Sequence, residues 1–303
     1  MVVLFKFILI IIPIFVVSCS NQSMSSSNPN STAMSRSVES TKLEKYYIRT
    51  SKRLKSRGLL RTDTGELDSP YSSRNLIENF EKIALYDEYV IKNGTFVSEE
   101  TKSQLKRWES SIKINIIHGK TTNKHQIKID KKNIAKFSRR LSQLTGLSIE
   151  YNEDKSNFII LFLDLDEQRT FGENLKKLMP LLTPAMIKAI TTTPRSTFCS
   201  AFALSKPSNA FEYTAAIILI KSEHSRLMRK SCIHEEMAQS LGLSNDSKVA
   251  RPSIFNDDEE FSLLTKHDEI LLKILYDQRL KPGMDNKEAM PIITTIAKEL
   301  INF

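Results

Sequence analysis

Hydrophobic positions change their spacing along this chain, and each change predicts a different secondary structure. Ile112, Ile114 and Ile116 alternate with polar residues, which predicts a half-buried strand. Residues 158–163 (FIILFL) and 215–220 (AAIILI) are continuous apolar runs, typical of central strands that are buried on both faces. Because helical patterns separate these runs, the chain predicts an α/β (α+β) fold with a single mixed sheet.

Helices are predicted where apolar residues recur every three or four positions. Ile134, Phe137 and Leu141 predict a helix over residues 130–145, and Gly146 stands where a helix commonly ends. Further helices are predicted over residues 41–97 (with a loop at 63–70), 166–195, 225–241 and 265–276, and from Pro291 onward. The predicted helix at 265 begins with capping-box spacing.

The first 39 residues predict export rather than a folded segment. Residues 1–19 have one early charge and an apolar stretch at 7–17, which is short for a membrane span and suits a signal peptide. The end of this segment resembles a bacterial lipobox, so we expect Cys19 to be acylated; the alternative is an ordinary signal peptide. Ser20 resembles the residue that directs lipoproteins to the outer membrane. Residues 20–39 are rich in Ser and Asn and predict a disordered tether.

The net charge of +9 is concentrated in one segment. Residues 42–61 contain eight basic residues and one acidic residue, so +7 of the charge lies there. Next to a lipid anchor, such a segment is suited to outer-membrane anionic lipid or lipopolysaccharide; the alternative is a solvated helix face. An exported destination, and aromatic residues that do not alternate with basic ones, argue against a nucleic-acid partner.

Two cysteines remain once Cys19 is assigned to lipid. Cys199 and Cys232 form an even pair in an oxidising compartment, which predicts a disulfide between them. The alternative is two buried free thiols.

Residues 234–246 have the spacing of a zinc-peptidase helix. Two ligands four residues apart leave the same face of a helix and can share one ion, while a glutamate after the first ligand holds the attacking water. If the pattern starts at His234, Glu235 is the base, but the second ligand position falls on Ala238.

A second register fits every spacing but lacks histidine. It starts at Glu235, makes Glu236 the general base and ends the helix at Gly242. The metal-ligand positions then fall on Glu235, Gln239 and Asn245. Zinc prefers imidazole and thiolate, and two neutral amide oxygens are weak donors. This donor set favours loss of the metal chemistry.

The sequence around this motif resembles two families. Residues 105–277 follow the order of matrixin-like metzincins, with PSIF at 252–255 in place of the methionine turn and a capped helix that ends in Leu275-Tyr276. A second resemblance, to a family of bacterial secreted proteins called domain of unknown function 2927, is carried by RGLLRTD, ENFEKIALYDEY, EEMAQSLGLSND, PSIFND, LTKHDEILLKILYD and RLKPGM. The metzincin resemblance implies a zincin-like domain at 101–303, after a basic helical segment at 40–100.

Three functions therefore stay open. The first is a cell-envelope lipoprotein whose degenerate metallopeptidase-like domain binds a peptide or envelope polymer without catalysis. The second is an active metallopeptidase with atypical ligands and Glu236 as the base. The third is a structural envelope protein that binds anionic lipid through residues 42–61. No cofactor is expected in the first and third, and zinc is required in the second.

Overall fold

The computed structural model describes residues 35–92, 95–256 and 258–301. The predicted signal peptide, Cys19 and residues 20–34 of the predicted tether lie outside these residues. Residues 33–303 belong to one compact unit. Within the described part of the chain, no helix has both the length and the apolar character needed to cross a membrane.

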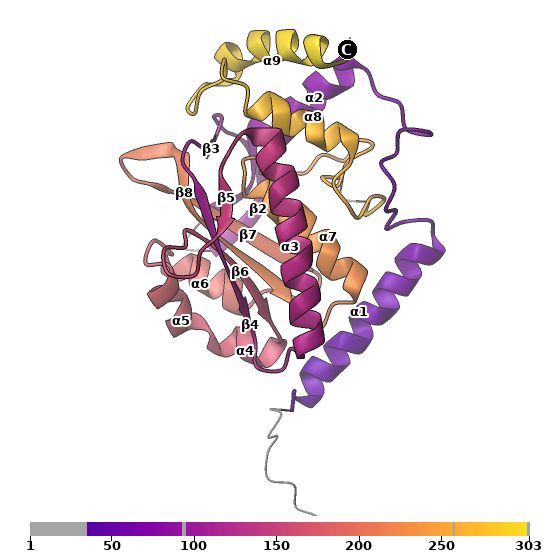
Figure 1. Cartoon of the computed structure of the whole chain (residues 1–303), viewed down its shortest axis with the longest axis vertical. Helices are drawn as coiled ribbons and strands as arrows, with labels where there is room; N and C mark the ends of the chain where they lie inside the picture. Colours follow the sequence, from indigo (N-terminus) through magenta and orange to yellow (C-terminus); the bar gives the residue numbers. More distant parts are fainter. Residues whose placement is uncertain (1–34, 93–94, 257, 302–303) are drawn as a thin grey trace, which may run out of the picture. The chain divides into compact units, whose positions relative to one another are not determined.

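A six-stranded mixed sheet lies at the centre of the fold (Figure 1). Its strands are β3 (Arg107–Trp108), β4 (Ile112–His118), β5 (Ile149–Tyr151), β6 (Phe158–Leu163), β7 (Cys199–Lys206) and β8 (Asn209–Lys221). The order β3-β8-β6-β4-β5 is parallel throughout, and β7 pairs with β8 antiparallel. In the central register, Ile160 of β6 is opposite Ile116 on one side and Ile218 on the other. The predicted mixed α/β fold is confirmed.

The apolar run of β6 is explained by helices on both faces of the sheet. Phe158, Ile160 and Phe162 belong to the larger core cluster, whereas the residues between them belong to a second cluster. The larger cluster includes residues of α3 (Lys124–Thr145), α7 (Arg226–Gln239) and α8 (Lys266–Leu275). The second includes residues of α5 (Gly172–Leu178) and α6 (Pro184–Thr191), which follow α4 (Leu165–Thr170). Successive side chains of a strand point to opposite faces, so both faces of β6 must be apolar.

The N-terminal part of the unit differs from its prediction. It contains α1 (Val38–Ser56) and α2 (Ser73–Ala84), followed by a hairpin of β1 (Tyr86–Lys92) and β2 (Thr95–Lys102). The expected continuation of the helix to residue 97 is therefore wrong. The segment 86–92 is rich in tyrosine and β-branched residues, which favour strands. The helical spacing of Leu76, Phe80 and Ile83 describes α2 alone.

Two predicted boundaries are confirmed and one needs correction. Gly146 ends α3 at a φ of 74°, and Thr265 and Asp268 form the predicted capping box of α8. The last helix, α9 (Asn286–Ile301), begins five residues before Pro291, so this proline lies inside it rather than at its start. Strand β7 was not predicted, because its apolar positions are less regular than those of its neighbour.

The predicted disulfide is confirmed. Cys199 at the start of β7 is bonded to Cys232 in the middle of α7. The bond therefore ties the antiparallel edge strand to the helix that carries the candidate site.

Candidate functional site

Helix α7 packs one face on the sheet and ends in a sharp bend. Cys232, Ile233 and Met237 are buried in the larger core cluster. Gly242 follows the helix with a φ of 121°, which favours glycine, and a Cβ there would lie 2.2 Å from the carbonyl oxygen of Lys106. The helix and bend that the motif requires are thus both present.

Two consecutive glutamates of α7 carry the strongest electrostatic perturbation in this region. Glu236 is buried, with 4 % of its surface exposed, and Glu235 is partly buried. Burial, with the neighbouring charges of Asp246 and Glu88, raises the pKa of Glu236 well above its usual value. Burial and the charges of Glu236 and Glu259 do the same for the pKa of Glu235. We call these five residues the carboxylate cluster.

One oxygen of the carboxylate cluster has no partner. The Oε2 atom of Glu236 is buried and makes no hydrogen bond with any described residue. An unsatisfied buried polar atom costs about 1–3 kcal/mol, and more when it belongs to a charged group. Such an atom in a native fold requires an explanation, and a ligand that donates to it is one.

The predicted ligand residues are not all brought together. The Nε2 atom of Gln239 lies 3.5 Å from an oxygen of Asp246, so Gln239 stays beside the carboxylate cluster. Asn245 is buried elsewhere: its amide nitrogen donates to the carbonyl oxygen of Lys82 at 2.9 Å and lies 3.3 Å from Oε2 of Glu100. This places Asn245 against the end of α2 and against β2. The residue after it, Asp246, takes its place beside Gln239.

His234 points into the core instead of toward the carboxylate cluster. Its ring stacks on Phe137 with 4.0 Å between centroids, and its Nδ1 accepts a hydrogen bond from the backbone N–H of Leu264 at 3.1 Å. Burial lowers the pKa of His234 to about 3, so the imidazole is neutral. In the described parts of the chain, no three or more His, Cys, Asp or Glu side chains are arranged to hold a metal ion.

The segment 252–255, which follows α7, is held in place by the carboxylate of Asp268. This carboxylate accepts hydrogen bonds from the hydroxyls of Ser253 and Thr265 and from the backbone N–H of Ile254. All four residues are buried. Residues 252–255, predicted to replace a methionine turn, therefore form a rigid turn packed on the start of α8.

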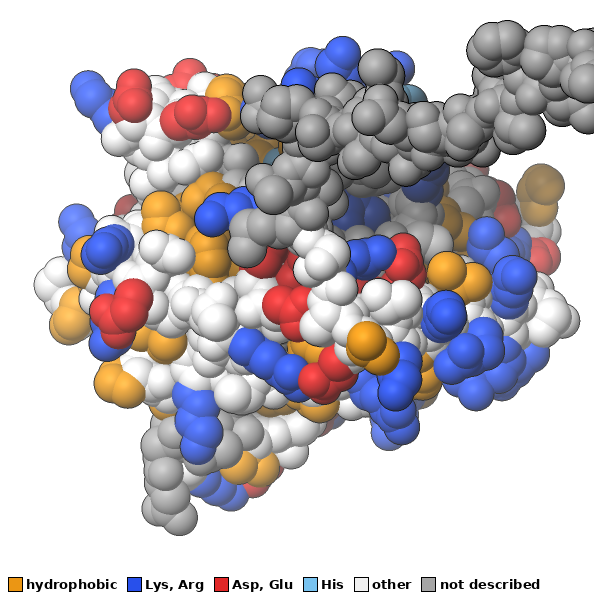
Figure 2. All heavy atoms as spheres, turned by 90° about the horizontal axis from the view of Figure 1, so that it is seen from below, with side chains coloured by type: hydrophobic (Ala, Val, Ile, Leu, Met, Phe, Trp, Pro, Cys, Tyr) orange, Lys and Arg blue, Asp and Glu red, His pale blue; other side chains and the backbone are white. Residues whose placement is uncertain are grey.

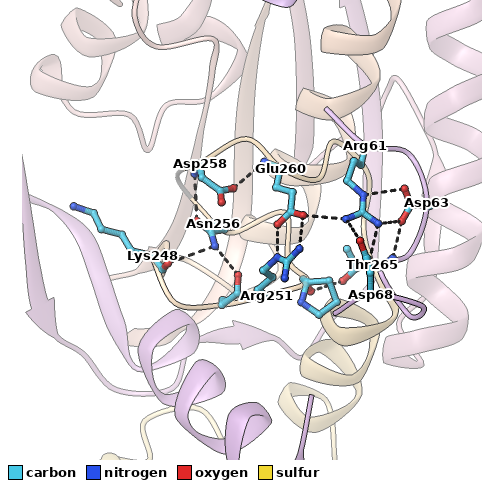
Figure 3. A network of polar contacts seen from close by, with 12 residues as sticks. Arg61, Asp63, Asp68, Lys248, Arg251, Asn256, Asp258, Glu260 and Thr265 are labelled. Atoms are coloured by element: carbon cyan, nitrogen blue, oxygen red, sulfur yellow. Dashed lines mark hydrogen bonds and ion pairs between the residues drawn. The ribbon is translucent and has the colours of Figure 1, made fainter. Parts of the chain in front are cut away.

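A second network fixes the loop that carries Glu259 (Figure 3). Glu260 binds the guanidinium groups of Arg61 and Arg251, and Arg61 also binds Asp63 and Asp68. These contacts raise the pKa of Arg61 further and keep it charged. Arg61 therefore holds two loops together. Because its charge is used in these ion pairs, only the basic residues that precede Arg61 in the segment 42–61 can present their charges to a partner.

The sequence analysis did not assign three members of the carboxylate cluster to the site. Asp246 was not among the predicted ligands, because the spacing pattern points to its neighbour Asn245. Glu88 lies on β1, in a segment predicted to be helical, and Glu259 lies in a loop without a motif. Contacts between segments 150 residues apart have no signature in local spacing.

Comparison with known families shows to which family this domain belongs. A model of the family described as protein of unknown function (DUF2927) matches residues 73–295, which is more than half of the chain. The chain belongs to the DUF2927 family. This confirms the stronger of the two resemblances. The match covers α2, the whole sheet and most of α9, so the carboxylate cluster lies within the DUF2927 region whereas α1 precedes it. Neither a curated protein nor a solved structure matches the chain significantly.

Proposed function

We propose that this DUF2927 protein is an exported, lipid-anchored envelope protein that binds without catalysis. Its ligand is a peptide or an envelope polymer, and the carboxylate cluster receives a positively charged group of that ligand, such as an amine. The observation that carries the proposal is the buried, unpartnered oxygen of Glu236 among like charges. An ammonium group would donate to this oxygen and offset the repulsion at once.

The donor set supports binding rather than hydrolysis. At the ligand positions of a zinc peptidase, α7 has Glu235 and Gln239, and the third position has Asn245, whose amide nitrogen is used to hold α2 and β2. The nearest histidine, His234, uses its Nδ1 in the core. Zinc-bound water needs strong donors such as imidazole around the metal. The helix, the glycine bend and the capped α8 support a metzincin-like scaffold whose histidines have been replaced.

The rival proposal is a metallopeptidase with Glu236 as general base. A raised carboxyl pKa is a property of many general bases and acids, so this rival deserves a direct test. Metal content of the purified full chain and cleavage of a mixed peptide library separate the two. Stoichiometric zinc, together with cleavage that Glu236→Gln abolishes, would establish the peptidase and overturn the binding proposal.

The binding proposal has its own test. Lysine-rich peptides and their acetylated counterparts are titrated into the full chain by calorimetry. We expect saturable binding only of the amine form, weakened about tenfold or more by Glu236→Gln, since a charge-assisted hydrogen bond contributes roughly 1.5–3 kcal/mol. As a control we use Glu173→Gln, an exposed carboxylate of α5. Equal binding of both peptide forms would contradict a charge-recognising site.

The lipid-binding role of residues 42–61 rests on a separate surface. On α1, Lys52, Arg53 and Lys55 are exposed, and Arg57 follows the helix. Figure 2 shows lysine and arginine side chains spread over the face that is drawn, with carboxylates between them. If this surface contacts anionic lipid, neutralising these four residues removes association with anionic vesicles and leaves the folded domain intact.

A further inference from the structure

A pocket of about 720 Å³ lies between α1 and the chain that follows α6. One wall consists of α1 residues and the other of residues 191–195, with parts of α4 and the end of β8. The hydroxyl of Tyr47 donates to the carbonyl oxygen of Arg195 at 3.1 Å, which joins the two walls. Pockets of this volume accommodate small molecules or compact head groups.

The walls of the pocket are strongly basic. Six cationic side chains line it, with one carboxylate: Lys42, Lys45, Arg49, Arg169, Arg195, Lys221 and Glu39. Glu39 makes a bidentate ion pair with Arg169, with N–O distances of 2.6 and 2.7 Å. Of the described carboxylates, none is ion-paired with the three α1 cations or with Arg195. The pocket lining therefore has a large excess of positive charge.

Lys221 forms the base of this basic pocket. It is buried, with 1 % of its surface exposed, and its ammonium donates to the carbonyl oxygens of Thr193 and Pro194 at 3.2 and 2.8 Å. An ammonium has three N–H donors, so one remains beyond these two. Burial lowers the pKa of Lys221 to about 8, and the charge of Glu223 opposes this effect, so the group is still mostly protonated at neutral pH.

The pocket also has an apolar part. Leu43, Tyr46 and Leu165 line it beside the cations, and the guanidinium of Arg195 lies over the ring of Tyr46, 5.0 Å from its centroid. A guanidinium that contacts an aromatic ring through its carbon keeps N–H donors available, and these donors match phosphate geometry. A ligand with an anionic head and a small apolar or ring portion would use both parts.

The geometry points to a binding site for a phosphate-bearing ligand in this pocket, formed by α1 on one side and by Arg169, Arg195 and Lys221 on the other. The phosphate is held by the cations, and the rest of the ligand lies on Leu43 and Tyr46. A free phosphorylated molecule and the head group of a phospholipid share this chemistry. The inference is independent of the carboxylate cluster, and it differs from the α1 surface contact because most of that surface lies outside the pocket.

The test compares two triple variants of the full chain. Lys45→Ala, Arg49→Ala and Arg195→Ala remove three exposed cations from the pocket. The matched control, K132A with K136A and R139A, removes three exposed cations from α3, outside the pocket and outside the α1 surface. Binding of inorganic pyrophosphate is measured by calorimetry, and binding of phosphatidylcholine vesicles with and without phosphatidylglycerol by co-sedimentation. Circular dichroism melts confirm that both variants fold.

We expect the pocket variant to weaken binding of at least one probe about tenfold or more, and the control variant to weaken it less than about threefold. Saturable pyrophosphate binding identifies a free phosphorylated ligand, and binding only to phosphatidylglycerol vesicles identifies a head group. Equal losses in the two variants would show diffuse attraction to exposed cations in general and overturn the pocket. Absence of any saturable binding by the unaltered chain at millimolar pyrophosphate and in both vesicle types would also overturn it.

Discussion

Glu236→Gln should make this protein more stable at neutral pH. The substitution keeps the shape of the side chain and removes its charge from a buried position where the strongest neighbouring charges, Asp246 and Glu88, are also negative. It also gives the side chain an amide N–H group, which can donate a hydrogen bond to one of those carboxylates. Most substitutions of buried polar residues destabilise a fold, so a gain here is a distinctive outcome.

The size and the pH dependence of the gain follow from the structure. An unsatisfied buried polar atom costs about 1–3 kcal/mol, which sets the expected increase in the free energy of unfolding at about pH 7. The folded-state pKa of Glu236 is raised above the unfolded value of 4.5. The folded state therefore binds the proton more tightly, and the unaltered protein loses stability as pH rises from 4.5 through the folded-state pKa. Below that window both states are protonated and the gain should disappear.

Urea unfolding at about pH 4 and about pH 7 measures both quantities. The control Glu173→Gln alters an exposed carboxylate that pairs with Lys176 and should change stability by less than about 0.5 kcal/mol at either pH. A variant no more stable than the unaltered protein at pH 7 would refute the reasoning. So would a gain of equal size at both pH values, because a charge effect must vanish when the carboxyl is protonated.

Three further substitutions test the supports of the site by urea unfolding. Replacing Cys199 and Cys232 by serine should cost roughly 3–4 kcal/mol, because the bond closes a loop of 33 residues; a loss under 1 kcal/mol would contradict this. Asp130→Ala should cost about 3–5 kcal/mol, since it leaves the buried guanidinium of Arg229 without its carboxylate; Asp154→Ala, an exposed loop position, is the control. Asn245→Ala should cost about 1–3 kcal/mol by leaving the carbonyl of Lys82 unpaired, and a neutral result would mean that Asn245 does not anchor α2.

Local periodicity was sufficient for most of the sheet and its helices. The runs at 112–116, 158–163 and 215–220 correspond to β4, β6 and the end of β8. They were predictable because the hydrophobic pattern of each run reflects which of its own side chains are buried. Strand β7 and the hairpin of β1 and β2 were missed, since edge strands and two-stranded hairpins are only partly buried and lack a strong pattern. The disulfide was predictable because only one pair of cysteines remained.

The candidate site was only partly predictable, and the reason is geometric. Spacing on one helix predicted Glu235, Glu236 and Gln239 as neighbours, and α7 carries all three. It could not decide which residue of the exit loop returns to the helix, because the bend at Gly242 sets that direction and Asp246 rather than Asn245 follows it. It also could not find Glu88 or the pocket cations Arg169 and Arg195, which approach from distant parts of the chain.

Under the proposed function, the relation between His234 and Glu235 explains how a metzincin-like scaffold would lose its metal ligands without losing its fold. Adjacent residues of a helix point about 100° apart. One position places an imidazole on the core side, stacked on Phe137, and the next places a carboxylate among like charges. The core side, with Cys232 and Met237, holds α7 on the sheet whatever occupies the other side. Residues on that other side can therefore change at a local cost, and under the proposed function the cost that Glu236 carries is that of a site kept for a cationic ligand.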